Sequence, residues 1–136
     1  MNEAREITIS VRNLKVGYGK NVILQNINFE VSHGEVFVIL GGSGSGKSTL
    51  LKNLTGLYTP LEGEVWITGG NVTAATDDER RDLLRRFGVT YQSGALFGSM
   101  SVLENVRLPL DELTALPEPL KELAALAKLK LLGLAV

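Results

Sequence analysis

Residues 41–49 read GGSGSGKST, and this segment constrains the fold more than any other part of the chain. It contains the pattern Gly-x-x-x-x-Gly-Lys-Ser/Thr, which begins at Gly41 and ends at Ser48. Glycines allow several backbone N–H groups to point at one polyphosphate, and the N-terminus of a following helix favours anions. The pattern therefore predicts a strand, a phosphate-binding loop and a helix in succession.

The residues around this loop have the properties that such a unit requires. Residues 36–40 (VFVIL) form a continuous apolar run, which is typical of a strand buried on both faces of a parallel sheet. A helix is expected from the loop to about Leu54, with Gly56 just after its end. A Gly/Ser turn without a ligand is the alternative interpretation, and the order of strand, loop and helix disfavours it.

Alternating apolar and polar residues predict further strands. Residues 7–12 alternate with a period of two, and so do residues 27–31 at the end of a second strand expected at 22–31. A turn cluster at 17–21 separates the two segments, so we expect an antiparallel layer before the loop. Shorter apolar strands are expected at residues 64–67 and 87–91.

Three helices are predicted in the remaining chain. Thr76 and Glu79 have the spacing of a capping box and start a charged helix, and Ser101 and Glu104 repeat this spacing. Beyond Pro119, leucine and alanine residues recur at helical spacing.

The composition excludes several classes of function. Lys and Arg number 14 against 15 for Asp and Glu, which argues against a dedicated nucleic-acid binder. Cysteine is absent, which suits a reducing compartment, and the single histidine, His33, cannot form a His-rich metal site. No segment has the roughly 18 uninterrupted apolar residues of a membrane span, and the first ten residues lack the apolar run of a secretory signal. We therefore expect any membrane role to depend on a partner.

A phosphate-binding loop alone is compatible with GTPases, small-molecule kinases and several kinds of ATPase. The guanine-reading pattern Asn-Lys-x-Asp is absent from the sequence, and so is Asp-x-x-Gly, which disfavours a GTPase. Kinases of this class usually carry the loop after their first strand, whereas here a predicted antiparallel layer precedes it. ATPases therefore remain.

Two further residues make the chain resemble the nucleotide-binding subunits of ABC transporters over nearly its whole length. Tyr18, in the segment VGYG, matches the aromatic residue that stacks on adenine in that family. Gln92 matches the glutamine that contacts Mg²⁺ or the attacking water and reports the nucleotide state to the membrane subunit. An ordinary turn aromatic and an unremarkable glutamine are the alternatives. The resemblance implies the α/β fold of a P-loop NTPase of ABC type, with an N-terminal antiparallel β layer.

ATP and Mg²⁺ are the ligands that this resemblance implies. Lys47 would contact the β- and γ-phosphates, while Ser48 and Gln92 would contact Mg²⁺, so Lys47 and Gln92 are the expected catalytic residues. The expected nucleotide-binding residues are Tyr18, Gly41, Gly42, Ser43, Gly44, Ser45, Gly46, Lys47, Ser48 and Thr49.

Residues 91–97 (YQSGALF) and 101–110 (SVLENVRLPL) are similar to the ATPases of the Mla type, which energise phospholipid trafficking between Gram-negative envelope membranes. The resemblance implies transport of phospholipid or another hydrophobic substrate, and a cytoplasmic position on the inner face of the inner membrane. The implied partners are a membrane permease subunit, contacted through residues 92–106, and a second ATP-binding subunit in a homodimer.

Within residues 92–106 the resemblance assigns two roles. The glycine-containing segment of residues 93–106, in which Gly94 and Gly98 lie, would act as a hinge when Gln92 gains or loses the metal and the γ-phosphate. Leu96 and Phe97 would enter a groove on the permease; alternatively, they cover the core of a helical subdomain.

The sequence departs from the family pattern in its later elements. The Leu-Ser-Gly-Gly-Gln signature, the Walker B carboxylates and the switch histidine are absent, and His33 precedes the loop and is therefore not that histidine. We expect the N-terminal half of an ABC domain, with the β layer and P-loop core in residues 1–91 and the Q-loop and start of the helical subdomain in 92–136. Such a chain is expected to bind nucleotide without hydrolysing it.

Two other functions stay open at this point. One is a soluble ABC-type ATPase of DNA repair or chromosome maintenance, although such proteins usually follow the loop with a coiled coil or a zinc module, and neither heptads nor cysteines occur. The other is a nucleotide-binding module without turnover.

Overall fold

The predicted antiparallel hairpin is the largest feature of the fold. In the computed structural model, which describes residues 6–93 and 95–134, β1 spans Ile7–Tyr18 and pairs with β2, Asn21–Ser32. β1 continues to Tyr18, well beyond the alternating segment. A register shift between Val11 and Leu14 interrupts the period of two, so alternation does not reveal the rest of the strand. The antiparallel pairing is confirmed, and β1 proves longer than the sequence pattern indicates.

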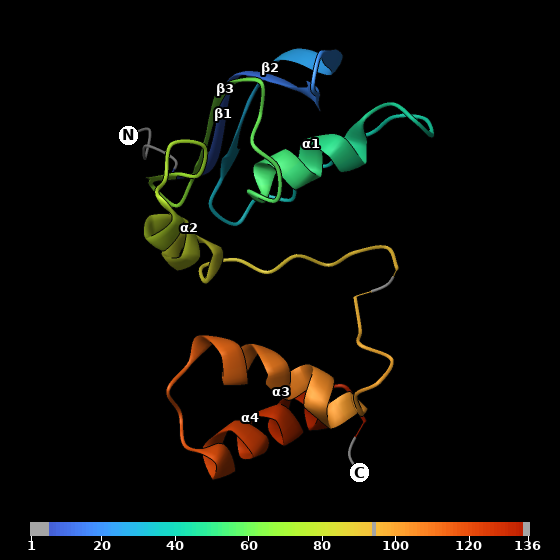
Figure 1. The fold of residues 1–136 in the computed structure, drawn as a ribbon, viewed down its shortest axis with the longest axis vertical. Helices are drawn as coiled ribbons and strands as arrows, with labels where there is room; N and C mark the ends of the chain where they lie inside the picture. Colours follow the sequence, from blue (N-terminus) through green and yellow to red (C-terminus); the bar gives the residue numbers. More distant parts are fainter. Residues whose placement is uncertain (1–5, 94, 135–136) are drawn as a thin grey trace. The chain divides into compact units, whose positions relative to one another are not determined.

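β1 is an inner strand of a four-stranded sheet. β3 (Glu62–Ile67) pairs with its other edge, the short β4 (Gly70–Asn71) pairs with β3, and the strand order is β2-β1-β3-β4. α1 (Lys47–Leu54) packs on this sheet (Figure 1). The buried apolar residues of the shared core are Val11, Leu14, Val16, Leu50, Leu54, Val65, Ile67, Val72 and Leu83.

The predicted end of the first helix and the predicted start of the second are both found. α1 ends at a C-cap, Thr55, followed by Gly56 with φ 72°. α2 (Asp77–Leu84) begins with the predicted capping box, in which the Glu79 N–H donates to Thr76 Oγ1 and the Thr76 N–H donates to the Glu79 carboxylate. Hydrogen bonds from the Thr76 backbone and side chain hold the pKa of Glu79 below its ordinary value.

Two predicted strands are wrong. Residues 36–40 and 87–91 have no strand pairing, and the apolar side chains of Val36 and Leu40 are exposed. An apolar run becomes a strand only where a neighbouring strand supplies hydrogen bonds, and residues 6–93 and 95–134 provide no such neighbour to either segment. The sheet of the described chain is therefore antiparallel, and the expected buried parallel strand is not formed in it.

A second compact unit begins at Thr90 and is described by itself. It contains α3 (Val102–Leu113) and α4 (Glu118–Leu131), which pack against each other (Figure 1). α3 starts with the predicted capping box of Ser101 and Glu104, and α4 is the helix predicted by the leucine spacing. No helix in the described part of the chain is long and apolar enough to cross a membrane.

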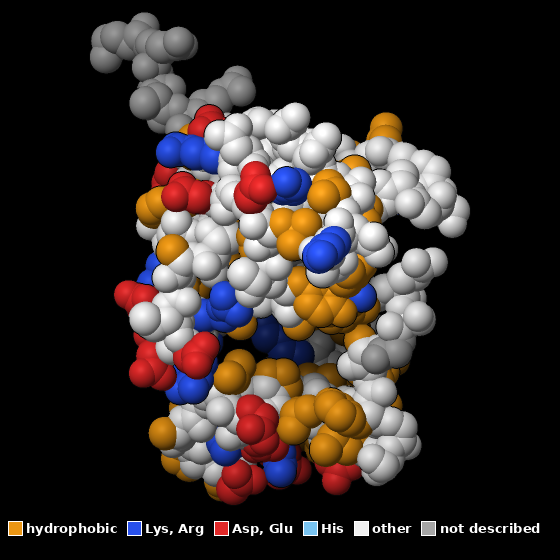
Figure 2. All heavy atoms as spheres, turned by 45° about the horizontal axis from the view of Figure 1, so that its top comes forward, with side chains coloured by type: hydrophobic (Ala, Val, Ile, Leu, Met, Phe, Trp, Pro, Cys, Tyr) orange, Lys and Arg blue, Asp and Glu red, His pale blue; other side chains and the backbone are white. Residues whose placement is uncertain are grey.

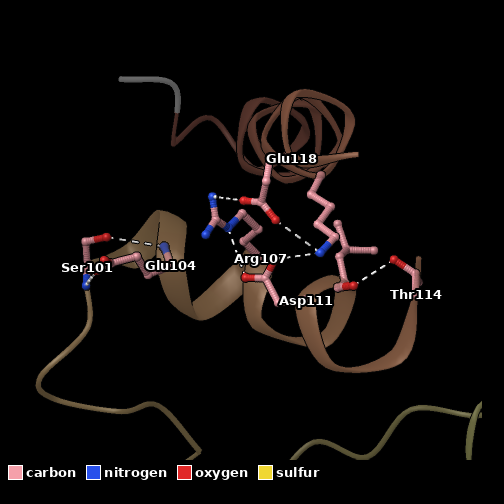
Figure 3. A network of polar contacts seen from close by, with 8 residues as sticks. Ser101, Glu104, Arg107, Asp111, Thr114 and Glu118 are labelled. Carbon is pink, nitrogen blue, oxygen red and sulfur yellow. Dashed lines mark hydrogen bonds and ion pairs between the residues drawn. The ribbon is translucent and has the colours of Figure 1, made fainter. Parts of the chain in front are cut away.

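Four charged side chains connect α3 to α4 (Figure 3). Arg107 Nε lies 3.0 Å from Asp111 Oδ2, and Arg107 Nη1 lies 3.2 Å from Glu118 Oε2. Lys121 Nζ lies 3.2 Å from both Asp111 Oδ1 and Glu118 Oε1. Burial raises the pKa of Asp111, but hydrogen bonds from Lys121 and Arg107 outweigh this effect and hold the pKa below its ordinary value.

Acidification is therefore expected to weaken the α3–α4 unit. A carboxyl whose pKa is lower in the folded than in the unfolded chain stabilises the fold above its ordinary pKa, and this contribution is lost as the pH falls through the folded value. The ordinary value for Asp111 is 3.8. Titration of its carboxyl followed by NMR should have a midpoint below that value, and Asp111→Asn should make stability less dependent on pH between about pH 5 and pH 3. A midpoint at or above the ordinary value would contradict this expectation.

Candidate nucleotide-binding site

The predicted phosphate-binding loop lies directly before α1. Gly46 is the N-cap of this helix, has φ 92° and provides no side-chain cap, so the first N–H groups of α1 are left for a ligand or water. Gly44 has φ 78°, a backbone conformation that favours glycine. The N-terminus of α1 therefore offers hydrogen-bond donors and the positive end of the helix dipole to an anion.

Close packing also requires glycine within the loop. A Cβ atom at Gly46 would lie 2.7 Å from Ile23 Cγ2 and 3.1 Å from Leu24 Cδ1, both on β2. At Gly41, a Cβ atom would lie 2.6 Å from Ser45 Oγ. The loop is thus folded tightly on itself and against β2.

The ammonium of Lys47 lies inside this loop. Its Nζ donates to the backbone oxygens of Gly41 and Gly42, each at 2.6 Å, and to Ser45 Oγ at 3.2 Å. These oxygens hold a positive charge beside the N–H groups at the start of α1, where an anionic ligand would benefit from both.

A small cavity opens at the loop and could hold part of a polyphosphate. Its volume is about 180 Å³, and residues 44–49 line it together with Ile23. Ser48 is exposed at this cavity. Mg²⁺ usually binds through one or two protein groups and completes its coordination with phosphate oxygens and water, so a single hydroxyl fits this ion. Within the described ranges there is no cluster of three or more acidic, histidine or cysteine residues that could hold a metal ion.

Tyr18 connects the end of β1 to the first turn of α1. Its hydroxyl lies 3.3 Å from Thr49 Oγ1, and its ring meets the ring of Tyr58 edge to face, with centroids 5.7 Å apart and an interplanar angle of 81°. Tyr18 is 47% exposed, so part of its ring is accessible to a ligand. The structure therefore places Tyr18 beside the helix that follows the loop.

Gln92 is the predicted site residue that this geometry does not include. Gln92 belongs to the second compact unit, where its side chain is exposed, whereas residues 41–49 belong to the first unit. Its contact with the nucleotide therefore stays a prediction. Of the two glycines in the expected hinge segment, Gly94 lies outside the described residues.

Three residues of the site were missed from the sequence. Lys52, whose Nζ lies 5.2 Å from the ring centroid of Tyr58, follows Thr49 by three positions, and this helical spacing was the one available signal. Tyr58 contacts the ring of Tyr18, and Ile23 packs next to Gly46. Both contacts join residues far apart in the sequence, so no local sequence pattern predicts them.

The sequence of the chain is similar to those of several transport proteins. The family model described as "ABC transporter" matches residues 24–134. The "Intermembrane phospholipid transport system ATP-binding protein MlaF" of Haemophilus influenzae is 40% identical over 126 residues, which are 93% of this chain and 48% of that protein. The "Probable ribonucleotide transport ATP-binding protein mkl" of Mycobacterium leprae is 38% identical over 128 residues, which are 94% of this chain and 37% of that protein. The chain thus spans about half, or less, of the length of these relatives.

Solved structures show the same relationship. The ATP-binding cassette MJ0796, in a dimeric post-hydrolysis state bound to ADP and Pi, matches with a TM-score of 0.78 at 33% identity, covering 90% of this chain and 56% of that one. Another dimeric structure of MJ0796, described as a bacterial ABC transporter cassette, matches with a TM-score of 0.79 at 35% identity and the same coverage. A family match over most of the sequence and a shared fold with solved members, 33% identical in the first, together show that the chain belongs to the ABC transporter family.

Proposed function

We propose that this chain binds ATP at the loop of residues 41–49 and provides the nucleotide-binding part of an ABC transporter subunit. The observation that carries this proposal is the position of Lys47, whose ammonium lies among loop oxygens at the N-terminus of α1. The direct test is ATP binding by the 136-residue chain, compared with the binding of a Lys47→Ala variant.

Each group of the site has a defined task in this proposal. The N–H groups at the start of α1 donate to phosphate oxygens, and Lys47 adds a positive charge beside them. Mg²⁺, held by Ser48 and by the phosphates, neutralises phosphate charge. Thr49 anchors the hydroxyl of Tyr18, whose accessible ring offers a stacking surface to the base.

We propose ATP hydrolysis for the subunit as a whole. We also propose that two such subunits form a homodimer, since the MJ0796 structures are dimeric. Hydrolysis needs a group that activates water in addition to the loop. The cavity at the loop is lined by residues 44–49 and Ile23, among which there is no carboxylate. Gln92 remains the proposed contact for Mg²⁺ or water, and residues 1–136 by themselves are expected to bind ATP without turning it over.

Phospholipid or another hydrophobic molecule is the proposed substrate class, on the strength of the similarity to MlaF. Ribonucleotides are the alternative, because mkl is similar to nearly the same extent. An ATPase acting on DNA is less well supported: acidic and basic side chains lie interspersed on the face shown in Figure 2, without a continuous basic patch there.

Residues 92–106 are the proposed contact with a membrane permease, which would hold the subunit on the cytoplasmic face of the membrane. Leu96 and Phe97 are 74% and 57% exposed. The Asn105 side chain accepts from the Phe97 N–H at 2.8 Å and donates to the oxygens of Phe97 and Met100. Asn105 therefore holds the backbone of Phe97, which follows Leu96 directly, and a docking surface benefits from side chains that are fixed in advance.

Phe97→Ala is expected to weaken copurification with the permease subunit by at least about tenfold, because exposed aromatic anchors dominate interface energies. ATP affinity should stay unchanged, since the loop belongs to the other compact unit. Leu116→Ala is the matched control, because Leu116 is also an exposed apolar residue of the second unit but lies outside residues 92–106. Equal losses for the two variants would contradict a docking role for Phe97.

A further inference from the structure

Two tyrosines from different parts of the chain contact the same side of α1. Tyr18, at the end of β1, has its hydroxyl 3.3 Å from Thr49 Oγ1. Tyr58, in the loop after α1, lies with its ring centroid 5.2 Å from Lys52 Nζ, and its N–H donates to the Lys52 oxygen at 3.1 Å. Because Thr49 and Lys52 are three residues apart, their side chains lie on the same side of the helix.

The two rings also contact each other while both stay accessible. Their centroids are 5.7 Å apart and their planes meet at 81°, an edge-to-face arrangement that stabilises aromatic pairs beyond simple burial. Tyr18 is 47% exposed and Tyr58 is 43% exposed. A tyrosine that only filled the core would be more deeply buried. The pair is therefore held in place without being removed from the surface.

We infer that Tyr58 is a positioning residue for the base of a nucleoside triphosphate, acting through Tyr18. A stacking surface binds more tightly when its ring is fixed before the ligand arrives, because less side-chain freedom is lost on binding. Thr49 restrains the hydroxyl end of Tyr18, and the ring of Tyr58 restrains its plane. Lys47 lies two positions before Thr49, so one helix carries both the phosphate-side charge and the supports of the base-side ring.

This inference rests on the proposed ATP binding, and a double-mutant cycle tests it with ATP and inorganic triphosphate as the two probes. Tyr18→Ala should lower ATP affinity about 5- to 100-fold, and Tyr58→Ala about 2- to 10-fold, both without changing triphosphate affinity. Combining the two should lower ATP affinity no further than Tyr18→Ala alone, because Tyr58 acts through Tyr18. Tyr58→Phe should bind ATP as the parent does, since the ring edge is retained.

Two controls separate positioning from a general loss of structure. Leu57→Ala removes an exposed apolar side chain from the same loop and should leave the affinity for both probes unchanged. Tyr58→Leu keeps apolar volume without an aromatic edge, and it should reproduce the selective loss even if Tyr58→Ala unfolds the loop.

Three results would overturn the role of Tyr58 while leaving ATP binding intact. These are an unchanged ATP affinity in Tyr58→Leu, an equal loss for ATP and triphosphate, or a full additional loss when Tyr58→Leu is combined with Tyr18→Ala. A parent chain that binds neither probe would instead remove the proposed function, and the role of Tyr58 with it.

Discussion

Replacement of Lys47 by alanine is expected to lower the affinity for ATP about 10- to 100-fold, since a hydrogen bond to a charged group contributes about 1.5–3 kcal/mol. The ammonium is already bonded to the oxygens of Gly41 and Gly42, so the variant loses both a phosphate contact and a support of the loop. Inorganic triphosphate should lose affinity by a similar factor, because Lys47 acts on phosphates. Isothermal calorimetry with both ligands measures these changes.

The matched control is Lys130→Ala, which removes the same charge from an exposed position on α4. It should leave ATP affinity unchanged, so that a loss in Lys47→Ala reports position rather than net charge. The Lys47 ammonium bonds only within the loop, and the core residues of β1 and α1 are untouched, so both variants should fold. Equal ATP affinity in Lys47→Ala and the parent would remove the phosphate-loop assignment.

Features with a local sequence pattern could be predicted. The antiparallel pairing of β1 with β2 follows from alternation, and the helix starts after Thr76 and Ser101 follow from capping-box spacing. The loop before α1 has glycines that the structure explains by a positive φ at Gly46 and by the close approach of other atoms at Gly46 and Gly41, while its binding of phosphate stays a prediction. In each case a short stretch of sequence carries the signal for the element that forms.

Features that depend on distant residues could not be predicted in this way. Residues 36–40 have the composition of a buried strand, but a strand also needs hydrogen-bonding neighbours, which the described chain does not supply. The edge-to-face contact of Tyr18 with Tyr58 joins the end of β1 to the loop after α1. The ion pair of Asp111 with Lys121 joins two helices. Neither residue pair lies at a spacing that a periodic pattern reveals.

Gly46→Ala is expected to have the largest effect on stability among substitutions in the loop. An L-residue at φ 92° costs about 1–2 kcal/mol, and the added Cβ would lie 2.7 Å from Ile23 Cγ2, an overpacking that typically costs a further 1–3 kcal/mol. The free energy of unfolding should therefore fall by about 2–5 kcal/mol. ATP affinity should fall as well, because relief of this contact moves the N-terminus of α1 away from β2.

Gly34→Ala separates the two causes of this loss. Gly34 also has a positive φ, 74°, but a Cβ atom there meets nothing within 4 Å, so only the backbone cost of about 1–2 kcal/mol should appear, with unchanged ATP affinity. Adding Ile23→Ala to Gly46→Ala removes the contacted methyl group and should restore part of the lost stability. Chemical denaturation of the four chains measures these differences. If Gly46→Ala and Gly34→Ala were equally destabilised, contact with β2 would not be what requires glycine at the start of α1.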